Sequence, residues 1–265
     1  MKSEHNDNGQ LLTFGGHLEV LRRMLFRMIL VVAVLAVAFF SFKEQTFHVL
    51  LAPSQWNFVT YRMLESCVHA IGFESFHFEP YHVRLVSTEL TSQFMLHLSS
   101  SCYLALLASS PYILWELFRF VAPALYVSER RVATWLVVAM YVLFMAGVAM
   151  SYYIVFPISF RFLGTYQVDV SVENTITLAS YIGTFATLTL LLGLMFQLPV
   201  VAFALGKLGL ISSSFLKRYR RHAFVIVLTL AAIITPSVDV FTLMLVTLPV
   251  YGLYVLCIVV VRWIE

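Results

Sequence analysis

Long apolar runs with almost no charge limit what this chain can fold into more than any other feature. Hydrophobic residues make up 60% of the sequence and charged residues 12%, against about 25% charged residues in an ordinary soluble domain. A helix needs about 20 apolar residues to cross a hydrocarbon core of roughly 30 Å. Six stretches qualify as candidates, so the sequence predicts an all-α polytopic membrane protein with one domain over residues 1–265.

The six predicted spans cover residues 24–43, 90–115, 132–158, 179–206, 222–236 and 240–261. The fifth has a charge-free core, 223–235, which covers only about 20 Å as a helix. It is either a buried core helix or a short span that thins the bilayer locally. The basic KRYRRH before it favours a span. The long segment 44–89 is predicted to be an outer loop.

Lysine and arginine set the predicted orientation, because these residues accumulate in cytoplasmic loops. Most of the 17 fall on one side of the predicted spans, together with both termini. That side is therefore predicted to be cytoplasmic, with both termini inside. Its basic residues are Lys2, Arg22, Arg23, Arg27, Arg119, Arg130, Arg131, Lys207, Lys217, Arg218, Arg220, Arg221 and Arg262.

Two segments beside the spans carry their own patterns. In HLEVLRRMLFRMIL, Leu18, Leu21, Leu25 and Met28 share one helical face. This pattern predicts an amphipathic helix lying at the cytoplasmic interface. After the third span, FRFLGTYQVDVSVENTITL is less apolar, and we expect an external loop with a short surface helix.

Common catalytic and binding patterns are missing from the sequence. There is no HExxH or Cys/His metal spacing, no GxSxG elbow and no glycine-rich phosphate loop. A net charge of +3 is too small to suggest a nucleic-acid partner. The polar first 20 residues lack a short apolar core, so no cleaved signal peptide is expected. The sequence therefore predicts neither a metal site nor a nucleophile of the serine-hydrolase type.

Gln197, in MFQLPVV, is the polar residue that stands out inside a predicted span. Pro199 frees a backbone carbonyl in the preceding turn, and an amide in lipid needs hydrogen-bond partners. The Gln197 side chain either satisfies this break in the helix or faces a polar cavity.

Five segments in order resemble TatC, the six-span core of the twin-arginine protein translocase. They are HLEVLRR, SPYILWELFRFVAPALYVSERR, FPISFRFL, MFQLPVV and KRYRRHAFVIVLTLAAIITPSVDVFTLMLVTLPVYGLY. The resemblance covers most of residues 17–254. Only the outer-loop segment 61–82 looks like an insertion.

The resemblance implies a function in protein transport. Members of this family bind the twin-arginine signal peptides of folded cargo proteins at the cytoplasmic face. They act with single-span TatA/TatB-type subunits and use the proton motive force. It further implies the bacterial inner membrane, a homo-oligomer within a receptor complex, and neither a cofactor nor covalent chemistry.

The resemblance also implies which residues contact the signal peptide. Glu129 matches the family's acid in FVAPALYVSERR, and Phe120, Pro123 and Tyr126 match its neighbours. A carboxylate pairs with a guanidinium in a planar, bidentate manner that lysine does not reproduce. The alternative for Glu129 is a structural role. As an acid in the first turn of the third span, it would be stabilised by the dipole of that helix.

Two further acids are candidates where the sequence departs from the family pattern. The family motif HLxELR reads HLEVLRR here, so Glu19 comes one residue early, which is about 100° around a helix. Glu116 stands one turn before Phe120, where a neutral residue is expected. It either supplies a second carboxylate to the arginine site or pairs with Arg119 or Arg22.

Other departures concern the span interior and the partner contact. Gln197 stands where the family often has glutamate, so a polar contact without proton transfer is expected there. Val255 and Leu243 replace polar family positions near the sixth span. The family's contact for single-span partners, at the outer ends of spans five and six, retains Thr235, Asp239 and Thr242.

A proton-coupled small-solute secondary transporter is the alternative function. Such folds usually contain two repeated halves with broken helices and charges at mid-membrane. The sequence shows neither an evident repeat nor such charges.

Overall fold

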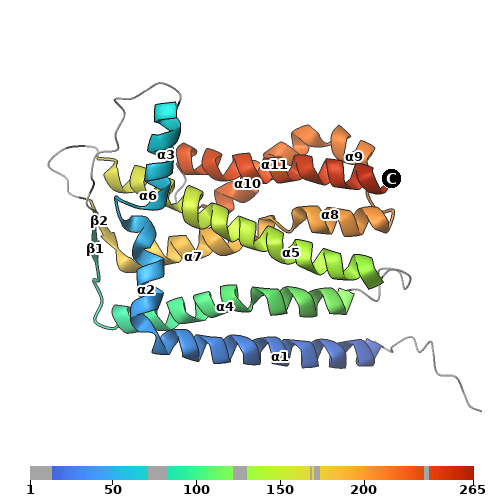
Figure 1. Ribbon diagram of the computed structural model, residues 1–265, viewed down its shortest axis with the longest axis horizontal. Coiled ribbons are helices and arrows are strands. Elements are labelled where there is room, and N and C mark those ends of the chain that lie inside the picture. The colour runs from blue at the N-terminus through green and yellow to red at the C-terminus, as the bar shows by residue number, and fades with distance from the viewer. Residues whose placement is uncertain are drawn as a thin grey trace, which may run out of the picture.

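The structure is a computed structural model that describes residues 14–70, 81, 83–121, 130–167, 169, 174–235 and 239–265. The helices that form the main bundle lie along the long axis of the molecule (Figure 1). They are α1 (Phe14–Ser41), α4 (Ser92–Val121), α5 (Arg130–Met150), α7 (Leu178–Met195), α8 (Leu198–Lys207), α10 (Arg220–Ile234) and α11 (Val240–Ile264).

Helices occupy all six stretches predicted to span a membrane, so the prediction of a helical polytopic membrane protein is confirmed. Within the described residues, four segments are long and apolar enough to cross: Leu18–Ser41, Trp135–Thr165, Leu178–Lys207 and Val240–Ile264. Helix α4 has 30 residues but carries several serines and His97, and α10 has only 15 residues. The count of six spans therefore stays a prediction.

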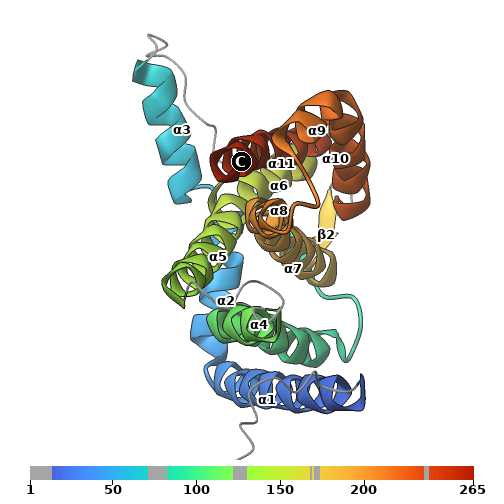
Figure 2. The same cartoon turned by 90° about the vertical axis from the view of Figure 1, so that its right-hand side faces the viewer.

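The helices pack in a curved row rather than around a central axis. Helix α1 packs on α4, α4 contacts α5 and α7, α8 packs on α11, and α11 on α10. Viewed from the end, α1 lies at one side of the molecule and α9 (Ser213–Arg218), α10 and α11 lie at the other (Figure 2). The two sides therefore present separate surfaces.

The predicted interfacial helix before the first span is wrong. HLEVLRR belongs to α1, which runs without a break from Phe14 to Ser41. In this segment Met24 is buried, at 4% exposure, whereas Leu18 and Leu25 of the apolar face are 50% and 44% exposed.

The third predicted span is longer than expected. A π-helical turn, Ser151–Val155, joins α5 to α6 (Phe156–Thr165). The Ser151 hydroxyl, fully buried, lies 3.0 Å from the Thr189 hydroxyl on α7 and ties the turn to the bundle. FRFLGT is therefore the end of a helix and not a loop, and the predicted surface helix is replaced, among the described residues, by the strand β2 (Thr175–Thr177).

The outer loop contains more structure than predicted. It holds α2 (Lys43–Leu51), a 3₁₀ turn (Ala52–Ser54), α3 (Val59–Ala70) and the strand β1 (Arg84–Val86). Strand β1 pairs in parallel with β2, with Leu85 opposite Ile176. This pairing links the outer loop to the segment that precedes α7.

The segment 61–82, predicted to be an insertion, is anchored through two tyrosines. The Tyr61 hydroxyl donates to the Pro157 carbonyl oxygen at 2.8 Å and lies 2.9 Å from the Tyr81 hydroxyl. The Arg161 guanidinium stacks over both rings, 5.2 Å and 4.9 Å from their centroids. These contacts fix Tyr61 and Tyr81, near the two ends of the segment, to α6.

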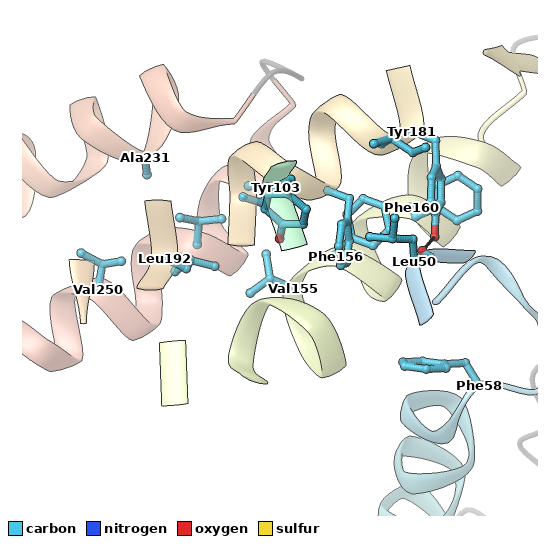
Figure 3. Close-up of a cluster of buried hydrophobic side chains, with 14 of the residues drawn as sticks. Leu50, Phe58, Tyr103, Val155, Phe156, Phe160, Tyr181, Leu192, Ala231 and Val250 are labelled. Atoms are coloured by element: carbon cyan, nitrogen blue, oxygen red, sulfur yellow. Dashed lines mark hydrogen bonds between the residues drawn. The ribbon is translucent and has the colours of Figure 1, made fainter. Parts of the chain in front are cut away.

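The main core lies between the outer-loop helices and α7, where aromatic rings meet edge to face (Figure 3). Tyr181, 2% exposed, donates its hydroxyl to the Leu50 carbonyl oxygen at 3.0 Å, the dashed line in Figure 3. Its ring centroid lies 5.0 Å from that of Phe156. Because a buried tyrosine hydroxyl requires a partner, this bond fixes α2 against α7.

Candidate functional site

The candidate residues for arginine binding gather at one end of the molecule. Glu19 lies near the start of α1, and Glu116 and Phe120 lie near the end of α4, which packs against α1. Pro123, Tyr126 and Glu129 lie outside the described residues. The residues that flank their segment, Val121 and Arg130, end α4 and begin α5 at this same end (Figure 1).

Glu116 is a buried carboxylate, only 4% exposed. Its Oε1 accepts hydrogen bonds from Arg27 Nη1 at 3.2 Å and from the Tyr112 hydroxyl at 3.0 Å. Within the described residues its Oε2 accepts no hydrogen bond. The site therefore holds a carboxylate that is fixed through one of its two oxygens.

The predicted pairing of Glu116 with Arg119 or Arg22 is wrong, because the partner is Arg27. The Arg119 guanidinium lies over the Trp115 ring at 5.7 Å, and that of Arg22 lies over Phe26 at 5.6 Å. Arg27 faces α4 across the contact between the two helices, so it alone of the three reaches Glu116. Arg27 and Tyr112 were not predicted as site residues. The only sequence signal was the spacing of Tyr112 one turn before Glu116.

Glu19 lies in a different environment. Its Oε1 is 3.1 Å from Arg23 Nη2, and the two side chains are 72% and 69% exposed. An exposed pair one helical turn apart contributes only about 0.3–0.5 kcal/mol. A ligand guanidinium can therefore replace Arg23 at little cost. Phe120 is half-buried and lies in the last turn of α4.

The burial of Glu116 gives an asymmetric prediction for its ion pair with Arg27. Arg27→Gln leaves a buried carboxylate without its cation and should lower the free energy of unfolding by about 2 kcal/mol. This is less than the usual cost of breaking a fully buried ion pair, because Arg27 is half-exposed and its charge is partly screened by solvent. Glu116→Gln should cost less, under about 1 kcal/mol, because Arg27 can turn to water. Chemical denaturation in mild detergent measures both.

Arg23→Gln is the matched control for this comparison, because its pair with Glu19 is exposed; it should change stability by less than about 0.5 kcal/mol. An equal cost for Arg27→Gln and Arg23→Gln would show that the buried pair does not hold α1 against α4.

Gln197 marks a break in the fourth predicted span. Helix α7 ends at Met195, and α8 begins at Leu198 with Pro199 in its first turn. Gln197 is 9% exposed, and its Nε2 donates to the Met140 carbonyl oxygen of α5 at 2.9 Å. The amide thus links the break to a neighbouring helix. Its buried Oε1 accepts no hydrogen bond from the described residues.

The predicted partner-contact residues surround the join between α10 and α11. Thr235, 3% exposed, donates its hydroxyl to the Ala231 carbonyl oxygen at 2.9 Å, and Asp239 Oδ1 caps α11 by accepting from the Thr242 amide at 2.7 Å. Thr242 is 1% exposed, and its Oγ1 accepts or donates no hydrogen bond within the described residues. All three sit at the end of the molecule opposite Glu116 (Figure 1).

These features define the class of protein. Long apolar helices in a curved row, with a buried acid–arginine pair near one end and a capped helix join at the other, belong to a helical polytopic membrane protein. Similarity to known proteins narrows this class to one family.

The family model "Sec-independent protein translocase protein (TatC)" matches residues 16–249. The TatC protein of Blattabacterium sp. from Periplaneta americana is 30% identical over 261 residues, covering 96% of this chain and 95% of that protein. The TatC protein of Carboxydothermus hydrogenoformans is 30% identical over 254 residues, with 96% and 94% coverage.

The chain belongs to the TatC family. A solved structure described as the twin arginine translocase receptor TatC superposes with a TM-score of 0.72 at 27% identity, covering 93% of this chain and 98% of that one. The protein is therefore a subunit of the Sec-independent, twin-arginine protein translocase. The small-solute transporter considered from the sequence finds no support in these relatives.

Proposed function

We propose that this subunit is a signal-peptide receptor. It binds twin-arginine signal peptides at the end where α1 and α4 meet and, with single-span TatA/TatB-type subunits, exports folded proteins using the proton motive force. The observation that carries the proposal is the Glu116 carboxylate. It is held in place by Arg27 and Tyr112 through Oε1, while Oε2 accepts no hydrogen bond from the described residues.

The chemistry of the ligand fits three carboxylates at this end. Two neighbouring guanidinium groups present planar forks of N–H donors, and each can pair with a carboxylate by two hydrogen bonds. Glu129 supplies the first carboxylate, and Glu19 supplies an exposed one after releasing Arg23. Glu116 contributes through Oε2. Phe120, Pro123 and Tyr126 are proposed to contact the signal peptide as well.

A binding titration tests the contribution of Glu116. Glu116→Gln keeps the hydrogen bond from Tyr112 but removes the charge, so it should weaken binding of a twin-arginine peptide about 5- to 10-fold. Glu44→Gln on α2 removes the same charge at the opposite end and should leave affinity unchanged. Unchanged affinity in Glu116→Gln would remove this residue from the site and leave it as a tie between helices.

The distribution of charge supports an inner-membrane location with both termini in the cytoplasm. Arg22, Arg119 and Arg262 lie on the ends of α1, α4 and α11 that face the same direction as the proposed receptor site (Figure 1). Lys43, Arg62, Arg84 and Arg161 lie on elements at the other end. Such a bias matches the accumulation of basic residues in cytoplasmic loops.

The contact with single-span subunits is proposed at the join of α10 and α11. Thr242 lines a cavity of about 220 Å³ together with Ser159, and the hydroxyls of both residues are buried without a hydrogen-bond partner in the described residues. Asp239 adjoins the cavity through its hydrogen bond with the Thr242 amide, and Thr235 ends α10 on the other side of the join. A polar side chain on a partner helix would satisfy these hydroxyls, because unpaired polar groups are costly in lipid. We also propose that several copies of the chain assemble within the receptor complex.

A further inference from the structure

Five basic residues gather where α9, α10 and α11 meet, away from the proposed receptor site. They are Lys217 and Arg218 on α9, Arg220 and Arg221 on α10, and Arg262 on α11. None of the five forms an ion pair in the part of the chain that the structure describes. This concentration of positive charge favours the binding of an anionic partner.

The acid at this end, Glu265, is already engaged. Its Oε1 accepts from the Ser213 amide at 2.7 Å, and its Oε2 accepts from the Ser213 hydroxyl. These hydrogen bonds, with Lys217 nearby, hold the pKa of the Glu265 carboxyl below its usual value. Glu265 therefore anchors the start of α9 and, of the five basic residues, offsets part of the charge of Lys217 only.

A cavity of about 510 Å³ combines this charge with an apolar wall. Its cations, Lys217, Arg220 and Arg262, come from three different helices, and its apolar wall includes Val255, Val259 and Trp263 of α11. Arg262, Val259 and Val255 are spaced three and four residues apart, so they follow one face of α11 from its charged end inward. The cavity therefore suits a molecule with an anionic head and an apolar chain.

A second, adjoining cavity extends the anionic end. It has a volume of about 850 Å³, shares Lys217 and Arg220 with the first, and adds Arg218, Arg221 and His222. Two neighbouring groups of cations connected by shared residues can hold two phosphates at once. Trp263, 90% exposed, stands at the rim, as tryptophan does at the headgroup level of membranes.

We propose that the join of α9, α10 and α11 is a binding site for an anionic phospholipid, with a preference for the diphosphate lipid cardiolipin. One phosphate binds between Lys217, Arg220 and Arg262, the other binds beside Arg218 and Arg221, and an acyl chain follows Val259 and Val255. Basic clefts between membrane helices are suited to such headgroups. This site lies on the side of the molecule opposite α1 and does not depend on signal-peptide binding (Figure 2).

Lipid titration of the full chain in neutral detergent, followed by native mass spectrometry, tests the site. Wild-type protein should retain cardiolipin most tightly, phosphatidylglycerol less tightly and phosphatidylethanolamine weakly. The triple variant Lys217→Gln, Arg220→Gln, Arg262→Gln should bind cardiolipin at least tenfold more weakly.

The control removes the same charge at the same end of the molecule. The variant Arg22→Gln, Arg23→Gln, Arg119→Gln should lose less than twofold in cardiolipin affinity. Equal losses in both variants would show that lipid is attracted by net charge alone and would overturn the site. Full competition by inorganic phosphate would also overturn it, because the apolar wall would then contribute nothing. A thermal melt of each variant in the same detergent establishes that the altered chains remain folded.

Discussion

Glu129→Gln is expected to weaken binding of a twin-arginine signal peptide by about 30-fold, the largest effect of any single change at the proposed receptor site. A hydrogen bond to a charged group contributes about 2 kcal/mol, which corresponds to that factor. Glutamine has nearly the same shape, but it offers one acceptor oxygen where the carboxylate offers two. A peptide labelled with a fluorophore and titrated with protein in detergent or nanodiscs measures the dissociation constant.

Two comparisons show whether this loss reflects guanidinium recognition. Glu44→Gln removes one negative charge from α2, at the other end of the molecule, and should leave the affinity unchanged. A peptide with paired lysines should bind wild-type protein more weakly and lose less on Glu129→Gln, because an ammonium does not pair by two parallel bonds. Equal losses for both peptides would contradict the receptor role of Glu129.

Gly147→Ala is expected to lower the free energy of unfolding by about 2–3 kcal/mol, within the range for overpacking a core. A β-carbon at Gly147 would lie 2.7 Å from the Leu192 carbonyl oxygen and 2.9 Å from the Gly193 α-carbon. Both are backbone atoms of α7, so the added methyl group can be accommodated only by moving α5 away from α7. Small residues allow membrane helices to approach this closely.

Gly183→Ala on α7 is the matched control, since a β-carbon there would meet nothing within 4 Å. It should be neutral or stabilising by up to about 1 kcal/mol, because alanine has the higher helix propensity. Denaturation of both variants in the same mild detergent makes the comparison. Similar stabilities for the two would mean that the α5–α7 contact can separate freely.

The helices could be predicted from the sequence because each apolar stretch carries its own signal. The break between α7 and α8 was also visible, since Pro199 cannot continue the backbone ladder of α7. The contact made by Gln197 could not be predicted from the sequence, because the Met140 carbonyl oxygen lies 57 residues away on another helix. Which helix faces an amide depends on how the helices are rotated and packed.

The same reason explains why the partner of Glu116 was missed. Arg22, Arg27 and Arg119 are all near it in the predicted topology, and only the packing of α1 on α4 selects Arg27. The pairing of β1 with β2 was also beyond sequence reasoning. Three-residue strands are too short to show a period of two, and two predicted spans lie between Arg84 and its partner Thr175 in the sequence.

A site-specific crosslink tests the receptor role most directly. A photoreactive residue in place of Val127, two residues before Glu129, is exposed to membranes with signal peptides that differ only in paired arginines or paired lysines. The proposed function predicts strong labelling by the arginine peptide and little by the lysine peptide, with the difference abolished by Glu129→Gln. Equal labelling by both peptides, or none by either, would contradict arginine recognition at this end of the molecule.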